Sequence, residues 1–276
     1  MKKVKALVLR TAGTNCDQET CLALRMAGAE PELIHINRLK EAKGGLNRFH
    51  ILALPGGFTY GDDVASGKIL ANEIKSALKA RIRSFISEGK LVIGICNGFQ
   101  VLVKMGLLPG TRGAGKFNVE SSLGLNDSGK FMARWVHLKN VHSHLGGERK
   151  KNSPLAVWTS GLPEVISLPI AHAEGKFIMR DKDTLNVLEK GEQVVLRYSD
   201  PTGTMYDGHF NPNGSENAVA GICDPTGRIL GLMPHPERYV SFLQHPNWRR
   251  KSCSQEGIPP GLRLFKSGVD FARKHL

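Results

Sequence analysis

The first half of the chain alternates short apolar runs with longer amphipathic stretches, and this pattern restricts the fold more than any other feature. The apolar runs predict four strands, Val4–Leu9, Pro31–Ile36, His50–Leu54 and Leu91–Ile95. Helical spacing predicts three helices between and after them, Asp17–Ala27, Ile69–Ser87 and Gly98–Met105. Strands that alternate with helices are typical of βαβ units, so the sequence predicts an α/β fold with a mostly parallel central sheet flanked by helices. Ligands bind such sheets beyond the carboxyl ends of the strands.

The second half has a different pattern, in which shorter strands are separated by turns. The segment Gly110–Gly129 is rich in Gly and Asn and predicts a loop. The strands expected after it are Lys130–Leu138, Val165–Leu168, Gln193–Tyr198, Ala218–Cys223 and Ile229–Met233. The last segment, Pro259–Leu276, is expected to close the chain as a helix. Because no repeat, low-complexity tract or linker divides the sequence, we expect one domain over residues 1–276, with the later strands extending the sheet.

Charge and cysteine content restrict the possible partners. The chain has 276 residues and a net charge of +13, but its basic residues are scattered. Aromatic residues are not interleaved with them as a base-stacking surface requires, so we expect no nucleic-acid partner. No apolar run is long enough to cross a bilayer, and we expect no membrane partner. The five cysteines are an odd number without CxxC or zinc-ligand spacing, so we expect no metal site and a reducing, cytoplasmic location.

The segment Gly94–Gln100 carries the strongest indication of chemistry. A buried strand ends at Cys96 and a helix follows at once, with Gly94 and Gly98 on either side of the turn. Such an elbow holds a nucleophile exposed above the sheet, and the helix N-terminus favours a thiolate there. The backbone N–H of Asn97 would face the same space and could bind an oxyanion. A cysteine that simply packs at a strand end is the alternative, and this segment alone leaves both open.

A nucleophilic cysteine needs a base, and the base needs an orienting group. The segment Met233–Arg238 contains both, because His235 and Glu237 lie two residues apart and share one side of an extended chain. The carboxylate would then fix the tautomer of the imidazole. The alternative is a surface loop with a solvated histidine, and the position of His-Pro-Glu directly after a strand makes that less favourable.

The Gly-Gly turn after the third predicted strand is a candidate for a second oxyanion donor. Glycine lets backbone N–H groups approach a ligand closely, so we expect this role for Gly57, with a plain β-turn as the alternative. Further on, Asp62 and Asp63 are adjacent and would point in opposite directions in a strand. We therefore expect a loop or helix cap there rather than a metal site.

The Gly-Gly turn, the Cys96 elbow and the His-Pro-Glu segment, in this order along the chain, resemble the triad (class I) glutamine amidotransferases. Within that class the chain is most similar to the glutaminase subunits of phosphoribosylformylglycinamidine synthase. The pieces that carry the resemblance are Gly13–Asp17, Pro55–Asp62, Gly94–Gln100, Pro169–Gly175, Asn211–Ser215 and Met233–Arg238. They span nearly the whole chain, and the resemblance implies a flavodoxin-like sheet.

The resemblance also implies a reaction. Cys96 would attack the side-chain amide of glutamine, and His235 would act as base and then as acid toward the leaving ammonia. Glu237 would orient His235, and water would hydrolyse the glutamyl thioester. The backbone N–H groups of Gly57 and Asn97 correspond to the oxyanion hole of the family.

Four further side chains are implied with less direct roles. Phe58 and Gln100 correspond to residues of the glutamine pocket. His172 and Glu174 belong to a family motif, and we expect them to support the site from behind its reacting groups. In the same motif Ala173 stands where the family usually has Gly.

The implied partner is an ATP-dependent synthetase subunit, with or without a small accessory subunit, that receives the ammonia and forms formylglycinamidine ribonucleotide in purine biosynthesis. ATP and magnesium are expected in that partner and no cofactor in this chain. Extra residues relative to compact family members are expected around Leu145–Asn152 and Gln244–Gly257. The alternatives are a glutaminase for another synthetase, a non-catalytic binding subunit, and a cysteine peptidase or chaperone-like relative.

Overall fold

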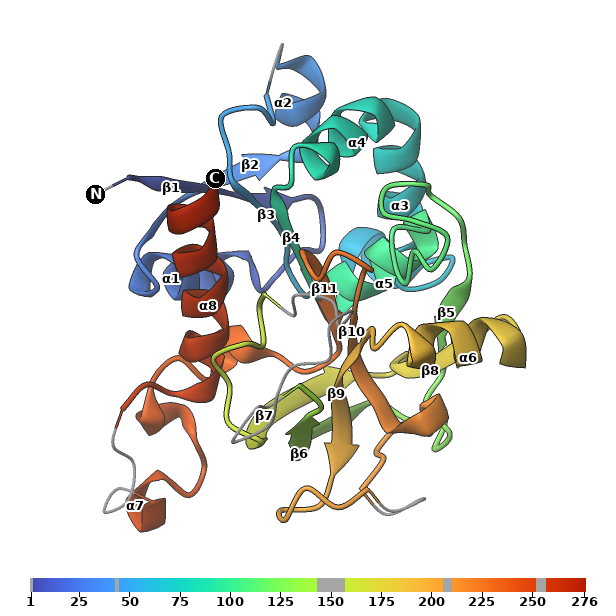
Figure 1. Cartoon of the computed structure of the whole chain (residues 1–276), viewed down its shortest axis with the longest axis vertical. Helices are drawn as coiled ribbons and strands as arrows, with labels where there is room; N and C mark the ends of the chain where they lie inside the picture. The colour runs from blue at the N-terminus through green and yellow to red at the C-terminus, as the bar shows by residue number, and fades with distance from the viewer. Residues whose placement is uncertain (1, 43–44, 143–156, 206–209, 252–256) are drawn as a thin grey trace.

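A nine-stranded sheet runs through the computed structural model, which describes residues 2–42, 45–142, 157–205, 210–251 and 257–276 (Figure 1). The strands lie in the order β2-β1-β3-β4-β11-β10-β9-β6-β7. Their bounds are β1 (Val4–Arg10), β2 (Ala29–His35), β3 (Ile51–Leu54), β4 (Leu91–Ile95), β6 (Met132–Asn140), β7 (Val165–His172), β9 (Val194–Ser199), β10 (Val219–Cys223) and β11 (Ile229–Leu232). Both halves of the sequence therefore contribute to the same sheet.

The first five strands in this order, β2 to β11, run parallel. Strands β3, β4 and β11 are buried along their whole length, as the continuous apolar runs predict. In the register of the sheet, Leu54 lies beside Gly94, and Leu232 beside Ile95. The carboxyl ends of these three strands thus meet at one edge, from which the Gly-Gly turn, Cys96 and the His235 segment continue.

The remaining four strands extend the sheet in antiparallel fashion from β10 to β7. Their presence confirms the prediction that the second half adds strands to a parallel core. A separate two-stranded ribbon pairs β5 (Ser121–Gly124) with β8 (Lys176–Met179).

Helices cover both faces of the parallel half. On one side lie α1 (Asp17–Met26) and α8 (Pro260–His275), and on the other lie α3 (Lys68–Ala77), α4 (Lys79–Ser87) and α5 (Asn97–Met105) (Figure 1). Of these, α5 is buried along nearly its whole length. It follows β4 directly, so its N-terminus lies at the edge where the three strands end.

Several predicted elements differ from the structure. The expected helix Ile69–Ser87 is two helices, α3 and α4, because Leu78 takes a non-helical backbone conformation (φ −123°, ψ 0°) while its side chain stays in the core. Apolar periodicity continues across that break and hides it. The expected loop Gly110–Gly129 contains β5, which is short and pairs with a distant strand.

Some elements were not predicted at all. Helix α2 (Ile36–Glu41) begins where a strand was expected to end, and α6 (Lys182–Lys190) and β8 were missed. The Asp181 side chain caps α6 by accepting from the Thr184 N–H, a start signal that is visible in the sequence. The expected strand ending at Leu168 continues to His172.

None of the described helices is long and apolar enough to cross a membrane. The expected insertion at Leu145–Asn152 lies outside the described residues. The one expected at Gln244–Gly257 is described only in part, and there it includes α7 (Trp248–Lys251).

Candidate active site

Cys96 occupies a sharp turn between β4 and α5. Its backbone has φ 49° and ψ −105°, a conformation that residues with a side chain rarely adopt. A hydrogen bond and close packing hold the turn in this conformation. The Cys96 N–H donates to the Leu232 carbonyl at 2.8 Å, and the neighbouring Gly98 packs directly against β3. A Cβ on Gly98 would lie 1.9 Å from the Leu54 carbonyl oxygen, so only glycine fits there. The predicted elbow is therefore present, with its strain concentrated at the cysteine.

The Cys96 side chain borders a cavity of about 100 Å³. It is 5% exposed, and its Sγ lies 3.7 Å from the Ala171 carbonyl oxygen at the end of β7. The cavity is lined by Asn15, Cys16, Gly57, Phe58, Cys96, Phe131, Ala171, His235 and Arg238. Segments far apart in the sequence thus converge on the thiol.

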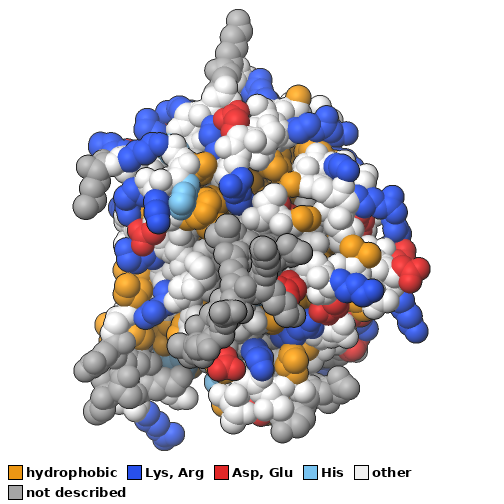
Figure 2. Space-filling model, viewed as in Figure 1, with side chains coloured by type: hydrophobic (Ala, Val, Ile, Leu, Met, Phe, Trp, Pro, Cys, Tyr) orange, Lys and Arg blue, Asp and Glu red, His pale blue; other side chains and the backbone are white. Residues whose placement is uncertain are grey.

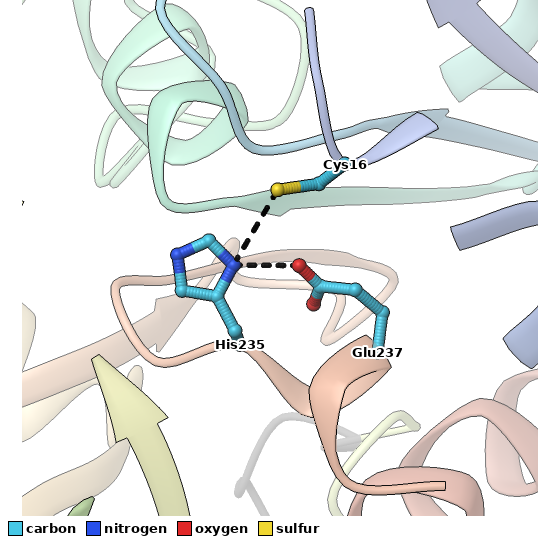
Figure 3. Close-up of side chains that lie close together, drawn as sticks. All are labelled: Cys16, His235 and Glu237. Atoms are coloured by element: carbon cyan, nitrogen blue, oxygen red, sulfur yellow. Dashed lines mark hydrogen bonds and ion pairs between the residues drawn. The ribbon is translucent and has the colours of Figure 1, made fainter. Parts of the chain in front are cut away.

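His235 enters the same cavity from the end of β11. Its Nδ1 lies 2.6 Å from Glu237 Oε1, and both side chains are almost fully buried (Figure 3). Because a carboxylate only accepts, Nδ1 must carry the proton that joins them. The predicted orienting pair is therefore formed. The His235 N–H also donates to the Pro169 carbonyl at 2.8 Å, which fixes the backbone of this segment to β7.

The protonation of His235 follows from its surroundings. Burial opposes the charged form, but the negative charge of Glu237, joined by that of the Cys96 sulfur in its thiolate form, outweighs burial and raises the pKa of His235 well above its usual value. Nε2, the other ring nitrogen, has no hydrogen-bond partner within the described part of the chain. With Nδ1 held by Glu237, Nε2 is the nitrogen that can exchange a proton with the thiol or a substrate.

Sequence reasoning missed a second thiol at the imidazole. Cys16 Sγ lies 4.0 Å from His235 Nδ1 and accepts a hydrogen bond from the Arg238 guanidinium at 3.1 Å. Arg238 is itself paired with Glu19 at 3.1 Å. Burial raises the pKa of the Cys16 thiol, so it is neutral at pH 7. Cys16 belongs to a motif used for the family resemblance, but nothing in its spacing placed it beside a residue 219 positions later.

Three of these groups could in principle bind a metal. One ligand atom each from Cys16, His235 and Glu237 lie within 4.8 Å of one another (Figure 3). However, the guanidinium of Arg238 already contacts the thiol, and Glu237 already holds Nδ1. A cation would have to displace both interactions, so the group is better explained as the support that orients His235.

The Gly-Gly turn is fixed by backbone pairing with the segment after β1. The Cys16 N–H donates to the Gly56 carbonyl at 3.2 Å, and the Phe58 N–H donates to the Gly13 carbonyl at 2.9 Å. A trans peptide points its carbonyl and N–H in opposite directions, so the Gly57 N–H is directed away from this pairing. Gly57 borders the cavity, as its predicted role requires, and its φ of 147° favours glycine.

The remaining predicted residues divide into two groups. Phe58 borders the cavity and is 45% exposed, with its ring 6.3 Å from that of Phe131. Gln100 lies beneath the elbow instead, where its carboxamide accepts from Asn97 Nδ2 at 2.9 Å and donates to the Glu174 carbonyl at 2.5 Å. Both ends of the Gln100 side chain are thus used within the protein, and a direct contact with substrate would require them to rearrange.

His172 and Glu174 lie behind the cavity rather than on its lining. His172 is buried at the end of β7, with Nδ1 3.1 Å from Asn126 Oδ1, and burial lowers its pKa to about 4. The Glu174 carboxylate accepts from the Ser66 N–H at 3.2 Å and lies 3.7 Å from Lys104 Nζ. These contacts agree with a supporting position.

Comparison with known proteins identifies the family of this chain. The chain is 43% identical to a phosphoribosylformylglycinamidine synthase subunit PurQ of Dehalococcoides mccartyi, over 99% of this chain and 100% of that protein. It is 39% identical to a PurQ subunit of Methanococcus maripaludis, over 98% of each chain. A solved structure of PurLQS from Thermotoga maritima matches with a TM-score of 0.69 and 30% identity, covering 98% of this chain and 99% of that one. The model of the CobB/CobQ-like glutamine amidotransferase domain matches residues 3–272, and the chain belongs to that family.

Proposed function

We propose that this chain is the glutaminase subunit of a phosphoribosylformylglycinamidine synthase and releases ammonia from glutamine. The observation that carries the proposal is that Cys96, on a strained elbow, shares a cavity with His235, whose Nδ1 is held by the buried Glu237. Relatives that match over nearly their whole length carry the name of this subunit. The geometry supports the reaction, and the relatives support the pathway.

In the proposed reaction the Cys96 thiolate attacks the side-chain carbonyl carbon of glutamine. The carbonyl oxygen becomes an oxyanion, for which the N–H groups of Gly57 and Asn97 are the proposed donors. His235 gives its Nε2 proton to the leaving nitrogen, the C–N bond breaks, and ammonia and a glutamyl thioester result. Water, deprotonated by His235 Nε2, then attacks the thioester and releases glutamate and the thiolate.

Glu237 is proposed to keep the Nδ1 proton in place through this cycle, so that Nε2 alone exchanges protons. Phe58 is proposed to line the glutamine pocket at the cavity mouth. Gln100, His172 and Glu174 are proposed to hold the floor and the back of the site, in keeping with their hydrogen bonds to neighbouring backbone and side chains.

The ammonia is proposed to pass to a synthetase subunit. The similar structure from Thermotoga maritima is titled PurLQS, which is compatible with one large synthetase and one small accessory subunit as partners. ATP and magnesium belong to that synthetase in this proposal, and this chain needs no cofactor of its own. A reducing cytoplasm is the proposed location, because the four cysteines that the structure describes are buried and free.

The proposal is tested by ammonia release from glutamine, measured for the wild type and for Cys96→Ala with and without the cognate synthetase, ATP and formylglycinamide ribonucleotide. We expect the wild type to be stimulated by the complete mixture and Cys96→Ala to lose activity by at least about 10³-fold. Cys21→Ala, a change of another buried cysteine in α1, is the matched control and should keep activity. Equal activity in wild type and Cys96→Ala would remove Cys96 as the nucleophile. A Cys96-dependent activity that the synthetase does not stimulate would reassign the pathway.

A further inference from the structure

A polar cluster beneath the elbow engages the whole side chain of Asn97, the first residue of α5. Asn97 is 1% exposed. Its Oδ1 accepts from Thr59 Oγ1 at 2.7 Å, and its Nδ2 donates to Asp62 Oδ1 at 3.1 Å and to Gln100 Oε1 at 2.9 Å. The reaction proposed above uses only the backbone N–H of Asn97, so this arrangement of its side chain needs a separate explanation.

The segment that supplies Thr59 and Asp62 is itself strained. Tyr60 and Asp62 both have φ of 55°, in the left-handed region that side chains disfavour. Such strain persists only where the surroundings hold it. Here the Tyr60 N–H donates to the Ala12 carbonyl at 2.9 Å, and the Tyr60 hydroxyl bonds to Glu73. The strained conformation places Thr59 and Asp62 on the same carboxamide.

The Asp62 carboxylate, which accepts from Asn97 Nδ2, is itself held by further hydrogen bonds. Its Oδ1 also accepts from the Gly67 N–H at 3.3 Å, and its Oδ2 accepts from Ser66 Oγ at 3.0 Å. Gly67 caps the N-terminus of α3 with φ of 72°. The carboxylate thus links the start of α3 to the start of α5, and neither end of the Asn97 carboxamide is left free to rotate.

The hydrogen bonds to the Asn97 side chain restrict the direction of the Asn97 backbone N–H. The first N–H groups of a helix have no partner within the helix. The Cys96 carbonyl of the same peptide accepts from the Gln100 N–H at 3.1 Å, which holds one side of this peptide, and the fixed Asn97 side chain restrains the Cα that follows it. An oxyanion donor must be placed to within a fraction of an ångström, and an error of about 1 Å costs on the order of 10²-fold in rate. The contacts of the Asn97 side chain add to the restraint that the backbone hydrogen bond gives this N–H.

We propose that Thr59 and Asp62 are positioning residues that aim the Asn97 N–H at the oxyanion formed on Cys96. The inference rests on the proposed glutaminase function and adds two residues to it. Neither residue is among those that line the cavity, and both contact the Asn97 carboxamide. Their effect should therefore appear in reactions that form an oxyanion and not in those that do not.

The experiment compares two reactions of the same thiol in Thr59→Val, which keeps the shape of Thr59 and removes its hydroxyl. Glutamine hydrolysis forms an oxyanion, whereas alkylation of Cys96 by iodoacetamide does not. We expect kcat for hydrolysis to fall about tenfold with KM changed by less than about twofold. The alkylation rate should stay within about twofold of wild type. Thr59→Ser restores the hydroxyl and should recover most of the lost kcat.

The matched control is Thr184→Val, which removes the hydroxyl of another buried threonine whose Oγ1 bonds to Asp181 Oδ1 at 2.6 Å in the cap of α6. It should leave both reactions unchanged. Asp62→Ala, which removes the carboxylate that accepts from Asn97 Nδ2, should reproduce the split between hydrolysis and alkylation if Thr59→Val fails to fold.

The outcomes separate this inference from the proposed function. Wild-type kcat in both Thr59→Val and Asp62→Ala would overturn the inference alone. An equal fall of hydrolysis and alkylation would do so too, because it would indicate general distortion of the elbow. Absence of Cys96-dependent hydrolysis in the wild type would overturn the proposed function, and the inference with it.

Discussion

At the scale of single residues, the carboxylate of Glu237 determines the protonation of the base. Burial alone would keep His235 neutral, but Glu237 reverses this and raises its pKa. In Glu237→Gln the attraction is lost and burial remains, so the pKa of His235 should fall. We expect kcat to fall by about 10²–10⁴-fold, because the amide no longer holds one tautomer. Imidazole nitrogen chemical shifts across a pH series measure the pKa, with His235→Asn identifying the signal.

Glu237→Gln should also lower the free energy of unfolding, by an amount that depends on pH. A histidine whose pKa is raised by folding stabilises the protein fully below its unfolded pKa, and this stabilisation is lost as pH rises through the folded pKa. The loss of unfolding free energy in Glu237→Gln should therefore be larger at pH 6 than at pH 9, as urea titrations would show. Glu19→Gln, in which the lost carboxylate pairs with Arg238 instead, is the control. An unchanged His235 pKa in Glu237→Gln would contradict the argument.

How far sequence could predict the site differs from residue to residue. Cys96, His235 and Glu237 lie together in the structure, and the sequence could predict them as candidates because an elbow and a strand end make chemical sense within a few consecutive residues. Cys16 and Thr59 were not found, because their contacts join segments far apart in the chain. For Gln100 the sequence motif predicts a residue of the glutamine pocket. In the structure both ends of its side chain form hydrogen bonds within the protein, which the motif could not indicate.

At the scale of elements, the strand–turn–helix unit of β4 and α5 stores backbone strain at Cys96. Its φ of 49° with ψ of −105° suits glycine better than any other residue. We therefore expect Cys96→Gly to be more stable than Cys96→Ala by about 1 kcal/mol, after allowing for the extra freedom that glycine gives the unfolded chain. Both variants lack the thiol, so the comparison isolates the backbone. Urea unfolding measures it, and a more stable Cys96→Ala would show that the turn carries no strain.

Elements were predicted well where local pattern and tertiary role agree. The strands β3, β4 and β11 are continuous apolar runs, β1 is apolar except for Lys5 and Arg10, and the predicted bounds of all four agree with the structure within a residue or two. The break at Leu78 between α3 and α4 was missed because the side chain on the break is apolar and buried, like those of the helices around it. The short pair β5 and β8 was missed because each is stabilised by the other across more than fifty residues.

At the scale of the whole molecule, the sheet brings four strand ends to one site. Gly57 follows β3, Cys96 follows β4, His235 follows β11, and Ala171 lies at the end of β7. The meeting of the first three follows from parallel pairing and was predictable. The fourth was not, since it depends on antiparallel strands whose order in the sheet differs from their order in the chain. The hydrogen bond from the His235 N–H to Pro169 shows that these added strands also hold the base.

Net charge acts on the whole molecule and on its encounter with a partner. Lys and Arg side chains are spread over the face seen in Figure 2, with fewer Asp and Glu among them, and the chain carries +13 overall. A charge of this kind speeds encounter with an acidic partner and is screened by salt beyond about 10 Å at 0.1 M. At subsaturating synthetase, we expect stimulation of glutamine hydrolysis to fall by about tenfold between roughly 0.02 M and 0.3 M NaCl.

The basal rate without synthetase is the internal control for this salt series. It should change little, because the charges that act on Cys96 and His235 are buried and are screened much less than surface charges. Saturating synthetase should restore full stimulation at high salt, since screening then weakens association without altering the completed site. Stimulation that is independent of salt at every synthetase concentration would show that the partner recognises this chain by shape and apolar contact, and that the excess of basic residues has no part in docking.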